Sequence, residues 1–266
     1  MKYFAFLLLL LFLISCDSKY DYASDATVIV VDGHIENDSV PLVSLSNSIN
    51  INSGNDDIIN NRFITDADVF VSDGITTEKL KLYKDKSYTL NYIYKGTKIK
   101  GVCGKTYNLT INYKGKMLTS STEIPKMVKL DSIQPCKTNQ YSYYFNAYFD
   151  DIQSEPDYYM FLSKDEISSL FNPSYLSLYS DSLLIYPIKL PVFSEDGKPF
   201  SGSVDIKLAH INREAYLFWY QYMHNIKLSN SIFFQISKSP ISNIFNGTGI
   251  WFGMATSQIS YINKSF

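Results

Sequence analysis

Lys105–Tyr113 reads KTYNLTINY, and after its first residue polar and apolar side chains alternate at every position. This two-residue period is typical of a half-buried antiparallel strand, in which one set of side chains faces a core and the other faces solvent. The two sets are Tyr107, Leu109, Ile111 and Tyr113, and Thr106, Asn108, Thr110 and Asn112. Lys114-Gly115 then supplies a hairpin turn into a second expected strand at Met117–Thr122. The stretch therefore predicts β structure.

Similar segments precede this hairpin, and turn residues separate them. The expected strands are Thr27–Glu36, with a turn signal at Asp32-Gly33, and then Pro41–Ser46, Ala67–Ser72 and Ser87–Tyr94. The Asn-rich segment Asn47–Asn61 is an expected loop between two of them. Short strands at this density predict a β-sandwich of about one hundred residues, which we place at residues 27–125.

Pro125 interrupts the strand pattern and marks an expected domain boundary. Beyond it, one stretch at residues 211–226 has apolar residues at three- and four-residue steps, and Asn212 is placed to cap it as a helix. We therefore expect a mainly β protein, in which an N-terminal β-sandwich is followed by a second β-rich domain, residues 126–266, with one amphipathic helix. The expected strands of that domain are Tyr141–Phe149, Asp157–Ser163, Leu183–Leu190, Ser203–Ala209, Ile232–Ser237 and Gly249–Ile262.

The first sixteen residues have the form of an export signal. Lys2 precedes an unbroken apolar run from Phe4 to Ile14, which is shorter than the roughly 20 residues of a membrane-spanning helix. The run ends in Leu-Ile-Ser-Cys, the form of a bacterial lipoprotein cleavage site. We expect residues 1–15 to be a signal peptide, Cys16 to carry a covalent lipid, and residues 16–26 to form a polar tether. Several acyl chains, at about 0.8 kcal/mol per buried methylene, would hold the protein on a membrane.

Composition narrows the range of partners. The chain has 24 Lys and Arg against 26 Asp and Glu, a net charge of −2 that argues against nucleic acid as a partner. Tyrosine (22) and phenylalanine (17) are abundant, and such residues favour strands and interfaces. Apart from Cys16, the cysteines are Cys103 and Cys136. They either form a disulfide, which an exported compartment permits, or remain two separate buried thiols.

Six segments stand in a characteristic order: Val28–Ile35, Ala67–Ser72, Gly104–Ile111, Leu130–Ile133, Glu214–Tyr216 and Asn243–Gly253. Together they resemble the family of Bacteroidetes lipoproteins catalogued as domain of unknown function 4249. The resemblance implies an outer-membrane lipoprotein whose first domain is immunoglobulin- or transthyretin-like. It also implies an accessory role in uptake beside a TonB-dependent transporter. It brings no established activity and no agreed binding residues.

The sequence offers no candidate catalytic residue. A Gly-x-Ser-x-Gly nucleophile motif is absent, and the neighbouring carboxylates Asp150-Asp151 and Asp165-Glu166 would point to opposite faces of a strand. Gly104-Lys105-Thr106 lacks the earlier glycine of a phosphate-binding loop, so a structural turn is expected there. We therefore expect a protein that is not an enzyme. Carboxylates distant in sequence leave a surface hydrolase as an alternative.

Metal and modification sites have weak signals. His210 and His224 border one expected helix and would lie about 21 Å apart along its axis, and His34 is remote in sequence, so no transition-metal site is expected. Asn55–Asp57 and Ser194–Gly197 lack the acidic spacing of a calcium loop and are expected turns. Three short motifs resemble the O-glycosylation sites of Bacteroidetes, and their acceptors would be Ser39, Ser132 and Ser182.

The tyrosines of the second domain are the candidate interaction surface. They are Tyr141, Tyr143, Tyr144, Tyr148, Tyr158 and Tyr159. Core packing is the alternative, but odd and even positions of one strand point to opposite faces, so aromatic side chains must occur on both. One face then meets another layer, a partner or a ligand. We expect an outer-membrane protein, lipid-anchored on the periplasmic or the cell-surface side, that works within a membrane complex or captures a glycan or peptide.

Overall fold

The computed structural model describes residues 28–48, 63–86, 91–139, 142–150, 156–168, 170–181, 188–194, 196–229 and 240–263. The predicted signal peptide, Cys16 and the predicted tether lie outside these residues. Within them the protein is mainly β with one helix, and several sheets pack in a sandwich-like arrangement, which confirms the predicted fold class. None of the helical structure in these ranges is long and apolar enough to cross a membrane.

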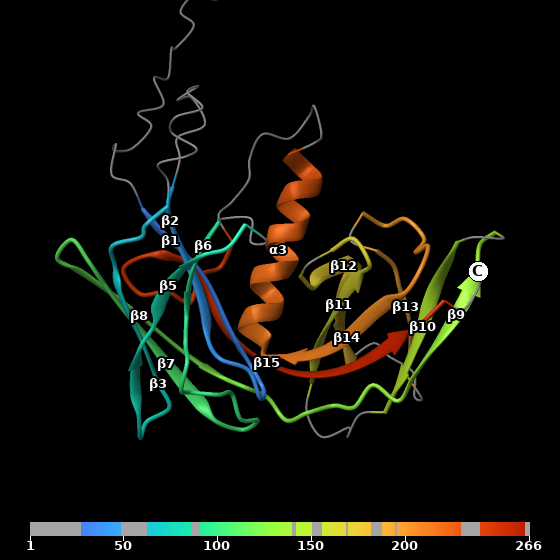
Figure 1. Ribbon diagram of the computed structural model, residues 1–266, viewed down its shortest axis with the longest axis horizontal. Helices are drawn as coiled ribbons and strands as arrows, with labels where there is room; N and C mark the ends of the chain where they lie inside the picture. The colour runs from blue at the N-terminus through green and yellow to red at the C-terminus, as the bar shows by residue number, and fades with distance from the viewer. Residues whose placement is uncertain are drawn as a thin grey trace, which may run out of the picture.

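Almost all of the regular structure is strand, and the helix lies between the last two strands of the chain (Figure 1). They are β1 (Ile29–Glu36), β2 (Leu42–Asn47), β3 (Asp68–Ser72), β4 (Thr77–Lys79), β5 (Lys81–Lys84), β6 (Tyr92–Lys95), β7 (Thr106–Tyr113), β8 (Lys116–Glu123), β9 (Ser132–Lys137), β10 (Tyr143–Phe149), β11 (Tyr158–Asp165), β12 (Asn172–Ser180), β13 (Ile188–Val192), β14 (Val204–Ile211), α3 (Arg213–Ser229) and β15 (Thr248–Tyr261).

These strands form three sheets. The largest has eight strands in the order β12-β11-β14-β15-β1-β2-β6-β5. A four-stranded sheet, β4-β3-β7-β8, and a three-stranded sheet, β13-β10-β9, complete the set. In Figure 1 the two smaller sheets lie at opposite ends of the molecule, and β15 runs from one toward the other.

The first core lies between the four-stranded sheet and the β1–β2 side of the large sheet. The alternation in β7 holds, because Tyr107, Leu109 and Ile111 are almost fully buried, as predicted. They join Val31 and Ile35 of β1 in one hydrophobic cluster. The β7–β8 hairpin also forms at the predicted turn, where Lys114 and Gly115 both have positive φ.

The second core lies between the three-stranded sheet and the other half of the large sheet. Phe145 and Phe149 of β10 pack in one cluster with Phe161 of β11 and Leu208 of β14. Aromatic rings dominate it, and Phe149 meets Phe161 edge to face with ring centroids 6.2 Å apart. Two separate sheets thus cover one face of the large sheet along its length.

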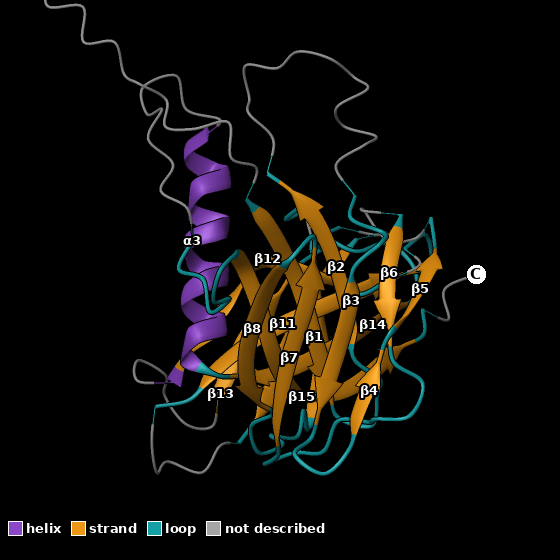
Figure 2. Cartoon of the chain, turned by 90° about the vertical axis from the view of Figure 1, so that its left-hand side faces the viewer, coloured by secondary structure: helices purple, strands orange, loops and turns teal. Residues whose placement is uncertain are grey.

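Helix α3 packs on the opposite face of the large sheet and lies along one side of the strands in Figure 2. Asn212 caps it as predicted, since its Oδ1 accepts the backbone N–H of Ala215 at 2.9 Å. Ala215 and Trp219 face the sheet, where they join a third cluster with Phe252 of β15. The predicted helix is therefore confirmed, and it runs three residues further than its apolar pattern indicated.

Strand β15 links the two halves of the molecule. It pairs in parallel with β1 and antiparallel with β14, so the sheet continues across the predicted boundary at Pro125. On one face Trp251 belongs to the first core, while Ile259 packs against the second. The C-terminal strand thus completes the N-terminal sandwich, an arrangement that leaves the two predicted domains joined by backbone hydrogen bonds.

Several local expectations need correction. Asp32-Gly33 is no turn but lies within β1, and a Cβ on Gly33 would come within 2.9 Å of the Trp251 ring, which explains a glycine there. Sequence reasoning also missed the strands β4, β5, β9 and β12. Strands β4 and β5 have only three and four residues, and β9 carries Pro135 at a sheet edge, so these three strands show no clear alternation.

Candidate functional site

The predicted tyrosine surface divides between two faces of β10. Its side chains alternate between buried and partly exposed, so Tyr143 lies in the second core and Tyr144 and Tyr148 point away from it. Tyr141 lies outside the described residues. The prediction of aromatic side chains on both faces of this strand agrees with the structure.

The next two candidates are packing residues. Tyr159 is fully buried in the second core, and Tyr158 on the other face packs against Tyr216 of α3 with ring centroids 4.9 Å apart. Tyr143 and Tyr159 therefore do not belong to a surface, because the strand period turns both into the core. Of the six tyrosines, Tyr144 and Tyr148 remain as surface candidates.

The outer side of the three-stranded sheet is a patch that we call the aromatic face, formed by Tyr144, Tyr148, Phe193, Gln134 and Lys189. Tyr144 stacks on Phe193 with centroids 5.3 Å apart and an interplanar angle of 26°. The Lys189 ammonium lies 5.7 Å from the Tyr148 ring, and the Tyr148 hydroxyl donates to Gln134 Oε1 at 3.0 Å. Rings, amide and ammonium at one surface are the groups that recognise a sugar or a protein partner.

A second polar region lies on the face of the large sheet that carries α3. In β1 the alternate residues Asp32, His34 and Glu36 point to this face, because Val31 and Ile35 are in the first core. The sequence contained this signal as three ionisable residues at two-residue steps in an apolar strand. The signal does not identify a site by itself, because a sequence does not show which strands lie beside β1.

A cavity of about 320 Å³ opens beside this row, and we call it the sheet pocket. Its lining comes from β1, the β1–β2 connection, β2 and β6. The lining residues are His34, Glu36, Ser39, Val40, Leu42 and Lys95. The volume is at the lower end of the range of small-molecule sites in proteins, roughly 300–1,000 Å³.

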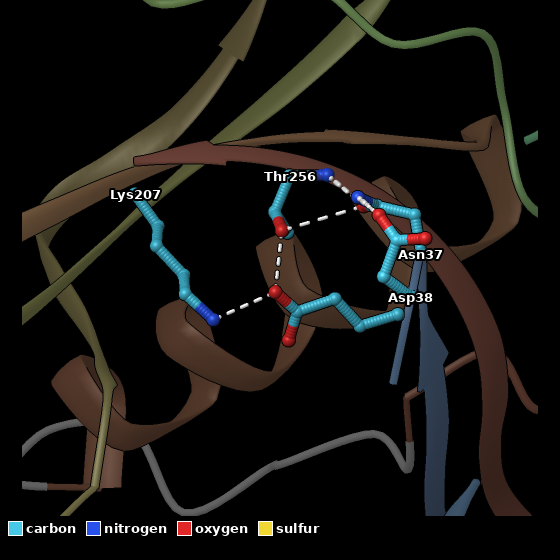
Figure 3. A network of polar contacts seen from close by, with 5 residues as sticks. Asn37, Asp38, Lys207 and Thr256 are labelled. Carbon is cyan, nitrogen blue, oxygen red and sulfur yellow. Dashed lines mark hydrogen bonds and ion pairs between the residues drawn. The ribbon is translucent and has the colours of Figure 1, made fainter. Parts of the chain in front are cut away.

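A polar network fixes Glu36 at the edge of the pocket. Glu36 Oε1 lies 2.6 Å from the Lys207 ammonium of β14 and accepts a hydrogen bond from the Thr256 hydroxyl of β15. Figure 3 shows Lys207, Thr256 and Asn37 converging here, and the Thr256 N–H donates to Asn37 Oδ1 at 2.6 Å. The Lys207 ammonium also lies 4.3 Å from the centre of the Phe171 ring.

Burial and neighbouring charges together shift the pKa values of Asp32 and His34 in β1. Desolvation lowers the pKa of His34, and the carboxylates of Asp32 and Glu36 only partly oppose it. The imidazole is therefore neutral at pH 7, with one nitrogen able to donate and the other to accept a hydrogen bond. Asp32 has an accessible surface, but the protein around it desolvates its carboxyl and raises its pKa, with His34 opposing.

The other two histidines have structural surroundings. His210 joins the halves of the chain, because its Nδ1 lies 2.7 Å from the Lys126 carbonyl oxygen and its Nε2 lies 3.0 Å from Asp157 Oδ1. His224 stacks on Tyr220 along α3. In the described part of the chain, no three His, Cys, Asp or Glu side chains gather in a metal-binding group.

The cysteines are two separate free thiols, so the disulfide alternative is not what the structure contains. Cys103 packs against the first core, whereas Cys136 lies on β9 at the edge of the second sandwich, with the Asn146 amide nitrogen 2.9 Å from its Sγ. The chain from Cys103 to Cys136 leads from the first core to the second, so the two thiols lie in different parts of the fold. Their spacing in the sequence does not show this.

The remaining motifs fall on turns and exposed positions. Asp196 receives Ser194 Oγ at 2.6 Å and Lys198 Nζ at 2.6 Å, so this carboxylate is already satisfied within its own turn. Gly104 has a φ of 77° in a turn. Ser39 and Ser132 are exposed. Asn55–Asp57 and Ser182 lie outside the described residues.

Comparison with known proteins gives one family. The family model "Domain of unknown function (DUF4249)" matches residues 15–260. No curated protein shows significant similarity to the chain. Among solved structures, a cytokine receptor complex matches at 9% identity over 70% of this chain and 85% of that one, with a TM-score of 0.27. A two-domain fibronectin type III segment of chicken tenascin matches at 11% identity over 70% of this chain and 90% of that one, with a TM-score of 0.22.

Proposed function

The chain belongs to the family described as Domain of unknown function (DUF4249), and from that membership and its leader we propose that it is a non-catalytic lipoprotein of the outer membrane. In this proposal the Cys16 lipid anchors the protein, which acts as an accessory of a TonB-dependent transporter or another outer-membrane complex. Anchoring confines both partners to one membrane and raises their effective concentration, so a modest interface is sufficient.

The aromatic face is the observation that carries this proposal. Tyr144 and Tyr148 are only partly buried. The second core does not include them, and its aromatic rings include Phe145, Phe149 and Phe161. Tyrosine contributes large contact area with few rotatable bonds, and it is enriched among the residues that dominate binding at interfaces. An outward pair of tyrosines on a strand that is paired on both sides therefore suits a protein interface.

Co-purification from mild detergent tests the accessory role. The acylated full-length protein should recover a large β-barrel protein, and the variant Tyr144→Ser/Tyr148→Ser should recover about thirtyfold less, since loss of an aromatic anchor weakens binding by about 2 kcal/mol. The matched control is Tyr83→Ser/Tyr220→Ser, which removes two exposed tyrosines on other elements. Equal recovery with both double variants, or no barrel protein with the unaltered chain, would contradict the proposal.

The anchor is tested separately. Intact-mass measurement should show cleavage before Cys16 and the added mass of acyl chains, and Cys16→Ser should move the protein from the membrane to the soluble fraction. An unmodified Cys16 with an uncleaved leader would remove the basis of the proposed location.

A second candidate function is direct capture of a glycan or peptide by the exposed protein. The sheet pocket favours this alternative, because it is separate from the aromatic face and has its own charged lining. A ligand-capturing protein should bind its ligand without any membrane partner, which distinguishes the two functions.

A further inference from the structure

The sheet pocket has an apolar floor between two polar ends. His34 of β1 pairs with Leu42 of β2, and Leu42 pairs with Lys95 of β6, so these three residues form one row across three adjacent strands. Neighbouring strands are about 4.8 Å apart, which places His34 and Lys95 about 10 Å apart at the backbone. Val40 and Leu42 supply apolar surface within that span.

One end of the pocket is positively charged. Lys95 lines the cavity, and Lys81 lies directly opposite it across the β5–β6 pair, so both ammonium side chains stand on the same face. Both are exposed, and neither has an ion pair among the described residues. Like charges in directly opposite positions of a sheet repel each other. A bound carboxylate would relieve this repulsion.

The other end presents a carboxylate that is already oriented. The contacts of Glu36 with Lys207 and Thr256 both involve Oε1, and in the described part of the chain its Oε2 has no recorded partner. A carboxylate accepts about four hydrogen bonds, so Oε2 is able to receive an N–H donor from a ligand. The neutral imidazole of His34 and the Ser39 hydroxyl lie in the same lining as further polar groups.

We propose that the sheet pocket binds a short peptide with free termini, with its carboxylate toward Lys95 and its ammonium toward Glu36. The Lys95 ammonium at one end, the open Oε2 acceptor of Glu36 at the other and the apolar floor between them match a zwitterion with small apolar side chains. A cavity of about 320 Å³ limits the ligand to a few residues. This site goes beyond the accessory role, and binding at it requires neither the lipid nor a transporter.

Calorimetric titration of the full-length protein in detergent tests the site, with dialanine as the probe. We expect saturable binding at or below about 10 mM, and we expect N-acetylation or C-amidation of the probe to weaken it about tenfold, which is about 1.4 kcal/mol. Lys95→Gln should weaken binding of dialanine by a similar factor. It should also abolish the preference for the free carboxylate over the amide, because it removes that partner.

Two further variants separate binding from folding. Glu36→Gln should abolish the preference for the free amine, but it also alters the ion pair with Lys207, so its unfolding must be measured in parallel. Lys116→Gln is the matched control, since Lys116 is an exposed lysine on β8 that does not line the pocket.

The proposal is overturned if dialanine gives no saturable binding at about 10 mM. Equal binding of the capped and free probes, or unchanged binding by Lys95→Gln, would also overturn it. Binding of glucose or a glucose oligomer with loss in Lys95→Gln would assign the pocket to a glycan instead. If the Lys95→Gln variant still co-purifies with a barrel protein, the accessory role does not depend on the sheet pocket. Failure of the peptide-binding proposal would then leave the accessory role unaffected.

Discussion

Glu36 Oε1 and Lys207 Nζ lie 2.6 Å apart, although 171 positions separate the two residues in the chain. Glu36 is on β1 and Lys207 is on β14, and β15 lies between these strands in the large sheet. The side chains therefore meet across the strand that completes the first sandwich. Their exposed fractions are 16% and 15%, so solvent screens this ion pair much less than a surface pair.

Loss of one partner should destabilise the fold. Lys207→Met leaves the carboxylate of Glu36 without its cation in a largely buried position, and we expect the free energy of unfolding to fall by about 2–4 kcal/mol. Urea denaturation at pH 7 measures this change. Lys198→Met is the control, since that lysine forms an exposed ion pair with Asp196 and should leave the unfolding free energy within error. Equal losses in the two variants would contradict the assigned role of Lys207.

Glu78 should make stability depend on acid pH. It is a buried carboxylate that accepts the N–H groups of Thr97, Lys98 and Ile99 and the Thr97 hydroxyl. Burial alone would raise the pKa of Glu78, but these hydrogen bonds lower it below 4.5. Because the folded-state pKa is the lower one, the contribution is present above about pH 4.5 and is lost as pH falls through the folded value.

Glu78→Gln therefore should reduce the free energy of unfolding by about 1.5–3 kcal/mol at pH 7, the range for hydrogen bonds to a charged group. The difference from the unaltered protein should shrink as the pH falls below 4.5. Denaturation curves at pH 7 and pH 4 measure it, and a difference that grows toward acid would reverse the sign argued here.

Gly249 should tolerate no side chain. Its φ is 113°, and a Cβ there would lie 1.9 Å from the carbonyl oxygen of Val31 on the parallel partner strand β1. Gly249→Ala combines a strained backbone with a clash against the main chain, and we expect a loss of about 3–5 kcal/mol. Gly104→Ala is the matched control, because its φ is 77° but nothing lies within 4 Å of an added Cβ. It should lose only about 1–2 kcal/mol, and equal losses would contradict the close approach of β15 to β1.

The two faces of the tyrosine-rich strands should respond differently to truncation. Tyr159→Ala removes a fully buried ring from the second core and should cost about 3–5 kcal/mol. Tyr144→Ala removes a partly exposed ring on the outer face and should cost about 1 kcal/mol, since its main ring contact is Phe193. Thermal or urea unfolding separates the two, and a Tyr144 variant as unstable as the Tyr159 variant would place the aromatic face in a core.

The thiols of Cys103 and Cys136 should both be titratable. After unfolding without reductant, alkylation should add two labels to the chain beyond any lipid on Cys16, because the two cysteines are unbridged. In the folded protein Cys103 should react slowly, since burial raises the pKa of its thiol and the thiolate is the reactive form. A mass lower by two hydrogens and no labelling would show that a bridge forms.

Some of this architecture was readable from local patterns. The alternation in Lys105–Tyr113, the cap at Asn212 and the long strand near the C-terminus each depend on side chains close in sequence, and the structure has all three. The short strands β4 and β5 were missed because three or four residues contain too little pattern. For the tyrosines, the odd and even positions along β10 predicted side chains on two faces of the strand. They could not show which of the two faces packs against the large sheet.

The sequence by itself determined that this chain is mainly β, which side of its clearest strands is apolar, and where the helix starts. The family match over residues 15–260 agrees with the resemblance that the order of its motifs indicated. Only the tertiary structure decided that β15 joins β1 to β14, that Glu36 meets Lys207, and that His34 and Lys95 line one pocket. The reason is physical: an alternating strand specifies its buried face, but its neighbours are chosen by packing and backbone hydrogen bonds between segments far apart in the chain.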